Sequence, residues 1–79
     1  ELEYGTDRVE MHIDAVMPGQ RVLLVDDLLA TGGTADASLQ LLRDAGRANV
    51  IGCSFVIELG FLNGAERLSP TPIHSLLKY

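Results

Sequence analysis

The chain has 79 residues, of which 47% are hydrophobic, and its net charge is −5. This length fits one domain with a limited core. The acidic excess disfavours a nucleic-acid or anionic-membrane surface, because either would need a basic patch. The single cysteine, Cys53, excludes an internal disulfide framework, and no apolar run approaches the roughly 18 residues of a membrane span. We therefore expect a protein of the reducing cytoplasm that has neither nucleic acid nor membrane as a partner.

The first third of the chain contains two predicted strands joined by a turn. Apolar and polar residues alternate over positions 8–15, which predicts a half-buried strand forming an N-terminal hairpin arm. Met17-Pro18-Gly19-Gln20 has the proline and glycine positions of a type II turn. Residues 21–25 are then almost wholly apolar, as in a strand at the centre of a parallel sheet covered by helices. The run ends in Asp26 and Asp27.

A strand–helix–strand unit follows from the next pattern. We expect a loop over 28–33, a helix over 34–45 with Thr34 as its N-cap, and a second buried strand over 49–59. Asn63 and Glu66 have the spacing of a capping box that opens a short helix. Residues 73–77 predict a last strand. The expected fold class is α/β, with a parallel sheet flanked by helices.

Two kinds of ligand-binding group stand side by side after the first apolar strand. In open α/β sheets, ligands bind beyond the carboxyl ends of the strands, where Asp26 and Asp27 are expected. Carboxylates accept hydrogen bonds, so they suit a ribose diol or a cation. Gly32 and Gly33 allow the backbone to approach a ligand closely, and the loop leads into a helix N-terminus that favours an anion. Together these groups describe a site for a ribose 5-phosphate.

Each half of this pattern also has an ordinary explanation. An Asp-Asp pair after a strand is found in magnesium sites, and a Gly-Gly pair before a helix is common as a plain turn. The chain contains neither the Gly-x-x-x-x-Gly-Lys-[Ser/Thr] loop nor the G-x-G-x-x-G fingerprint of two large nucleotide-binding classes. The joint spacing of aspartates and glycines favours the ribose phosphate.

The string DDLLATGGT at positions 26–34 resembles the phosphoribosyl pyrophosphate (PRPP) binding motif of the type I phosphoribosyltransferases. Within that family, the segments Leu2-Glu3-Tyr4-Gly5 and Ser75-Leu-Leu-Lys-Tyr79 are most similar to the adenine phosphoribosyltransferases. The resemblance extends over nearly the whole chain but corresponds to about the C-terminal half of such an enzyme. Residues 1–79 are thus expected to be the C-terminal part of one domain, with an incomplete type I fold, and the N-terminal part of the same protein would be its partner.

The resemblance implies a reaction of purine salvage, in which adenine and PRPP give AMP and pyrophosphate with Mg²⁺ bound to PRPP in a homodimer. It implies that Asp26 and Asp27 bind the ribose hydroxyls and that Leu28 and Leu59 border the adenine. It also implies that Glu3 handles the purine proton, which makes Glu3, Asp26 and Asp27 the expected catalytic residues. The 5′-phosphate would lie in a cradle of Ala30, Thr31, Gly32, Gly33 and Thr34.

Two other functions remain open from the sequence. The chain could belong to a phosphoribosyltransferase for another purine or for orotate, or to a noncatalytic regulatory module that binds PRPP. Such a module keeps the aspartates and the glycine loop but need not keep Glu3, so the segment around Glu3 favours an enzyme. The 79-residue chain alone is expected to lack transferase activity, because the groups that bind pyrophosphate and most of the base site belong to the other half.

Overall fold

The computed structural model describes residues 16–79, and it has three strands and two α-helices within that range. Met17 and Gln20 close the predicted turn, with a hydrogen bond of 3.0 Å from the Gln20 N–H to the Met17 carbonyl and a φ of 79° at Gly19. The elements in chain order are β1 (Arg21–Leu29), α1 (Gly33–Asp44), β2 (Asn49–Glu58), a 3-10 turn (Gly60–Leu62), α2 (Gly64–Arg67) and β3 (Ile73–Lys78).

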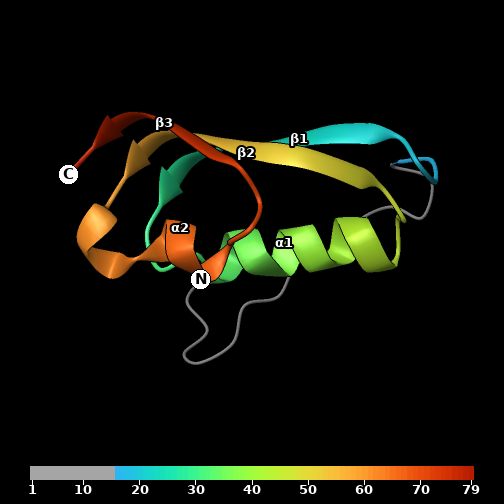
Figure 1. The fold of residues 1–79 in the computed structure, drawn as a ribbon, viewed down its shortest axis with the longest axis horizontal. Helices are drawn as coiled ribbons and strands as arrows, with labels where there is room; N and C mark the ends of the chain where they lie inside the picture. The colour runs from blue at the N-terminus through green and yellow to red at the C-terminus, as the bar shows by residue number, and fades with distance from the viewer. Residues whose placement is uncertain (1–15) are drawn as a thin grey trace.

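The three strands form one parallel sheet in the order β1-β2-β3. Both helices lie on the same face of this sheet, with α1 running beneath β1 and β2 (Figure 1). The α/β fold with a parallel sheet and helices is therefore confirmed. The predicted strand over 8–15, which would form the hairpin arm, lies outside the described residues. No helix in residues 16–79 is long and apolar enough to cross a membrane.

The core fills the space between the sheet and α1. Leu39 of α1 is almost fully buried, as are Cys53 and Phe55 of β2. Leu29 and Leu68 extend this cluster towards the end of the sheet that carries the glycine loop. The core is thus continuous with the base of the loop, so burial of Leu29 fixes where the loop begins.

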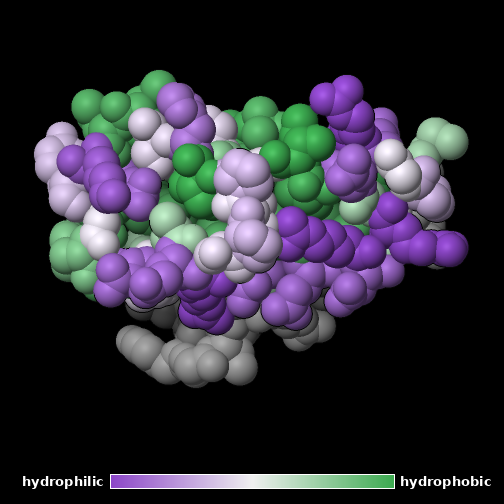
Figure 2. Space-filling view, in the orientation of Figure 1, coloured by the Kyte–Doolittle hydropathy of each residue, from purple (hydrophilic) through white to green (hydrophobic). Residues whose placement is uncertain are grey.

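The opposite face of the sheet carries exposed apolar side chains. Val25 of β1 and Leu76 of β3 are 67% and 68% exposed, and both alternate with residues on the helix-covered face. Figure 2 shows hydrophobic side chains gathered over the strands. Among residues 16–79, β1 lies at the edge of the sheet and only one of its faces is covered, so this part of the chain leaves the prediction of a central strand covered on both faces untested.

Three local predictions differ from the structure. β1 continues through Leu29 instead of changing to a loop at Leu28, because parallel pairing with β2 extends from Arg21 to Leu29. The N-cap of α1 is Gly32, not Thr34, since the helix begins one residue before Thr34. Asn63 does precede α2, but its side chain makes no capping hydrogen bond. Its backbone is left-handed, which explains why the capping-box geometry does not form.

Candidate functional site

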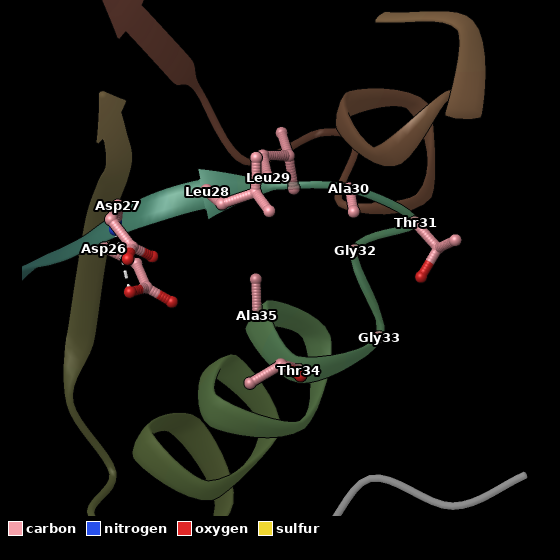
Figure 3. A pocket seen from close by; sticks show the side chains of 10 residues that line it. All are labelled: Asp26, Asp27, Leu28, Leu29, Ala30, Thr31, Gly32, Gly33, Thr34 and Ala35. Atoms are coloured by element: carbon pink, nitrogen blue, oxygen red, sulfur yellow. Dashed lines mark hydrogen bonds between the residues drawn. The ribbon is translucent and has the colours of Figure 1, made fainter. Parts of the chain in front are cut away.

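A pocket of about 250 Å³ lies at the carboxyl end of β1, and ten consecutive residues line it. These are Asp26, Asp27, Leu28, Leu29, Ala30, Thr31, Gly32, Gly33, Thr34 and Ala35 (Figure 3). The pocket is smaller than the roughly 300–1,000 Å³ of sites that enclose a whole drug-sized ligand. Its size suits one part of a nucleotide, such as a sugar phosphate. Two acceptor side chains lie at one end of this stretch and a helix N-terminus at the other.

Asp26 and Asp27 are exposed side chains of the last part of β1. The Oδ1 atom of Asp26 accepts a hydrogen bond of 2.8 Å from the Asp27 backbone N–H (Figure 3). This bond orients the Asp26 carboxylate and leaves its second oxygen directed elsewhere. Because Leu24 and Leu29 pack in or against the core on either side, the strand holds both carboxylates at the pocket without burying them. The pair can accept hydrogen bonds from a diol.

The glycine loop ends at a helix cap that only glycine adopts easily. Gly32 is the N-cap of α1 and has a φ of 90°, in the left-handed region. The Asp36 N–H donates the first helical hydrogen bond, of 2.8 Å, to the Gly32 carbonyl. The N–H groups of Gly32 and Gly33 therefore lie outside the helix ladder, at the positive end of the helix dipole. This is the arrangement that binds phosphate at helix N-termini.

Comparison with protein families identifies the same region. The model of the phosphoribosyl transferase domain matches residues 4–70, which include the whole pocket. The chain belongs to the phosphoribosyl transferase domain family.

Adenine phosphoribosyltransferases from several organisms are similar to this phosphoribosyl transferase domain over most or all of its length. The adenine phosphoribosyltransferase of Rhodopirellula baltica is 57% identical over 100% of the chain, which spans 38% of that protein. The crystal structure of adenine phosphoribosyltransferase from Thermoanaerobacter pseudethanolicus matches with a TM-score of 0.91 and 52% identity, over 100% of this chain and 45% of that one. The Trypanosoma brucei enzyme, solved with AMP, pyrophosphate and ribose-5-phosphate, matches with a TM-score of 0.68 and 32% identity, over 76% and 29% of the two chains. The chain thus spans less than half the length of these relatives.

The short helix α2 packs behind the glycine loop in this phosphoribosyl transferase domain. The Gly64 carbonyl oxygen would lie 3.0 Å from a Cβ placed on Gly32, and a Cβ placed on Gly64 would collide with the Ala30 carbonyl. Neither residue can therefore carry a side chain without a shift of the loop. The sequence predicted only that a helix begins after Asn63. Nothing in the local pattern there indicates that Gly64 packs against the loop that contains Ala30 and Gly32.

The predicted base-contacting residues lie at the same end of the sheet. Leu28 lines the pocket, and the Leu59 backbone N–H donates a hydrogen bond of 2.9 Å to the Leu29 carbonyl. Leu59 is thereby held beside the end of β1, although its side chain does not line the pocket. Glu58 is buried at 7% exposure and accepts a hydrogen bond of 2.9 Å from the Ser75 hydroxyl. Glu3 lies outside the described residues.

Cys53 takes no part in this site. It is a free thiol in the core, and burial raises its pKa, while the nearby Arg43 guanidinium offsets part of that effect. In residues 16–79 no three His, Cys, Asp or Glu side chains are grouped so that they could hold a metal ion. A metal at the pocket of this phosphoribosyl transferase domain would need ligands beyond the two aspartates.

Proposed function

We propose that this chain is the ribose 5-phosphate-binding part of an adenine phosphoribosyltransferase, which converts adenine and PRPP to AMP and pyrophosphate. The observation that carries the proposal is the pocket itself. Within ten consecutive residues it joins two exposed carboxylates to a glycine loop at a helix N-terminus. The names of the relatives and the ligands of the Trypanosoma brucei structure support adenine as the base.

The two ends of the pocket bind different parts of the substrate. Asp26 and Asp27 accept hydrogen bonds from the 2′- and 3′-hydroxyls of the ribose, and the backbone of residues 30–34 binds the 5′-phosphate. Thr31 and Thr34 add hydroxyl groups to this cradle. Holding the diol and the phosphate at once fixes the orientation of the anomeric carbon, which lowers the entropic cost of the attack.

The reaction replaces one bond at that carbon with another. The bond between C1′ and the pyrophosphate oxygen breaks, and its electron pair leaves with pyrophosphate. A nitrogen of adenine donates the electron pair of the new C–N bond, and the purine loses its proton to Glu3. Positive charge develops on the ribose ring during this exchange, so the nearby carboxylates of Asp26 and Asp27 stabilise the transition state electrostatically.

Magnesium fits this site only together with the substrate. Mg²⁺ is commonly bound by one or two carboxylates together with substrate phosphates. Asp26 and Asp27 lie beside this position but accept hydrogen bonds from the ribose hydroxyls, so the phosphates of PRPP would hold the ion. When bound, the ion neutralises charge on the pyrophosphate leaving group.

The remaining features of the proposal concern the base and the assembly. Leu28 and Leu59 border the adenine ring, since Leu28 lines the pocket and Leu59 is tied to the end of β1. The partner of this chain is the N-terminal part of the same protein, and the complete protein is a homodimer in the cytoplasm. The free, buried thiol of Cys53 is compatible with a reducing compartment.

Titration calorimetry of AMP into the complete protein that contains this chain tests the proposal, because most of the base site lies outside these 79 residues. We expect Asp26→Asn and Asp27→Asn each to weaken AMP binding by at least about tenfold, because a charge-assisted hydrogen bond contributes roughly 1.5–3 kcal/mol. Gly33→Val should also weaken binding, since a branched side chain would crowd the phosphate. Asp44→Asn at the end of α1 removes the same charge away from the pocket and serves as the control.

The base class is tested in the same experiment. Orotidine monophosphate and inosine monophosphate replace AMP in separate titrations, and we expect AMP to bind most tightly. Tighter binding of either competitor would reassign the base. Unchanged AMP affinity in both aspartate variants would refute the assignment of the ribose diol.

A further inference from the structure

Arg67, at the end of α2, is a cationic side chain that no part of the proposed mechanism uses. Its Cδ atom lies 3.5 Å from the position of a Cβ placed on Gly32. Its Nε atom lies 3.5 Å from Oδ2 of Asp36, in the first turn of α1. Arg67 therefore connects α2 both to the glycine loop and to the helix whose N-terminus faces the phosphate site.

Asp36 places a negative charge where the proposed ligand is also negative. A carboxylate in the first turn stabilises a helix through its dipole, but the same charge repels an anion bound at that helix end. Both carboxylate oxygens have neighbours, since Gln40 Nε2 donates a hydrogen bond of 3.4 Å to Oδ1 and Arg67 faces Oδ2. Of these two neighbours only Arg67 carries a charge that can offset that of Asp36.

We propose that Arg67 is a positioning residue for the phosphate site. Its guanidinium offsets the charge of Asp36, so that the helix end stays attractive to an anion. Arg67 does not line the pocket, so it acts through Asp36 rather than by contact with the ligand. The inference rests on the proposed function, because the anion is the 5′-phosphate of the nucleotide.

The effect should be modest and electrostatic. The side chains of Arg67 and Asp36 are 49% and 31% exposed, so solvent screens the pair. We expect Arg67→Gln to weaken AMP binding by about threefold at low salt, the scale of a partly screened charge. The conservative Arg67→Lys variant keeps the charge and should keep most of the affinity.

Two further variants separate charge from structure. In the double variant Asp36→Asn with Arg67→Gln, the uncompensated charge is gone, so AMP affinity should return to near the wild-type value. Arg21→Gln removes the same charge at the start of β1, at the opposite end of the strand from the loop, and should leave affinity unchanged. At about 1 M salt, where the Debye length is about 3 Å, the difference between wild type and Arg67→Gln should nearly vanish.

Calorimetric titration of AMP into the complete protein that contains this chain, and into its variants, decides the matter, with circular dichroism to establish that each variant is folded. Wild-type affinity in Arg67→Gln would overturn the inference and leave the proposed function standing. So would a double variant as weak as Arg67→Gln, or a loss that is the same at both salt concentrations, since either outcome indicates a purely structural role. Absence of AMP binding by the complete wild-type protein would overturn the proposed function and this inference with it.

Discussion

Gly32→Ala should destabilise the chain more than a glycine substitution at any ordinary turn. Gly32 has a φ of 90°, and a left-handed alanine costs roughly 1–2 kcal/mol. Its Cβ would also lie 3.0 Å from the Gly64 carbonyl oxygen and 3.3 Å from Gly64 Cα, both backbone atoms that cannot turn aside. Relieving such a contact requires a shift of α2 or of the loop, for which overpacking data indicate about 1–3 kcal/mol.

Gly19→Ala is the matched control for this prediction. Gly19 has a similar φ of 79°, but a Cβ placed on it meets no atom within 4 Å. The control therefore includes the backbone cost and not the collision. We expect Gly32→Ala to lower the free energy of unfolding by about 2–4 kcal/mol and Gly19→Ala by about 1 kcal/mol.

Urea denaturation followed by circular dichroism measures both variants on the same scale. AMP titration then reports whether Gly32→Ala also disturbs the loop, which we expect because Gly32 caps the helix whose N-terminus faces the proposed phosphate site. If Gly32→Ala cost no more stability than Gly19→Ala, the argument that α2 forms a rigid back to the loop would fail.

Three other outcomes follow from the described contacts. Leu39→Ala should lower the free energy of unfolding by about 2–5 kcal/mol, whereas Leu76→Ala on the exposed face should change it by less than about 0.5 kcal/mol. Chemical denaturation compares the two variants, and equal losses of stability would contradict the placement of the core. Ser75→Ala should lower the free energy of unfolding by about 1–3 kcal/mol at pH 7, because it removes the hydrogen-bond donor to the buried Glu58 carboxylate. Unchanged stability in the same assay would show that water replaces the hydroxyl. Cys53 should react with a chromogenic thiol reagent far more slowly in the folded chain than in urea, because burial hides the thiol and raises its pKa. The absorbance of the thiolate that the reagent releases gives the two rates, and equal rates would mean that the core opens readily.

The sequence predicted the order and type of the elements because most of their signals are local. The turn at residues 17–20, the helix after the glycine pair and the strands that begin at Asn49 and Ile73 all carry propensity patterns of their own. The residues of the motif at 26–34 are consecutive, so their nearness to one another is local as well. For this reason every predicted phosphate-cradle residue lines one pocket in the structure.

The wrong predictions share a cause in tertiary contacts. Asp26 and Asp27 interrupt the apolar pattern of β1, so the pattern suggested the end of the strand, but pairing of Asp26 with Phe55 and of Leu29 with Glu58 continues it. Thr34 has a better N-cap side chain than Gly32, yet the left-handed turn beside Gly64 selects glycine. Gly64 and Arg67 show no local signal, because their importance arises from packing against a distant loop.

The pocket is built from one uninterrupted stretch of chain, from Asp26 to Ala35. The gene segment for a stretch of this kind can be duplicated or recombined as a unit, so the proposed sugar-phosphate site can be transferred to another protein. Changes at Leu28 and elsewhere in a protein can then alter which base is joined to the proposed sugar site, while the two aspartates and the glycine loop remain the same. Selection for a new substrate would therefore act mainly on the surroundings of this segment, and the segment itself would record common descent.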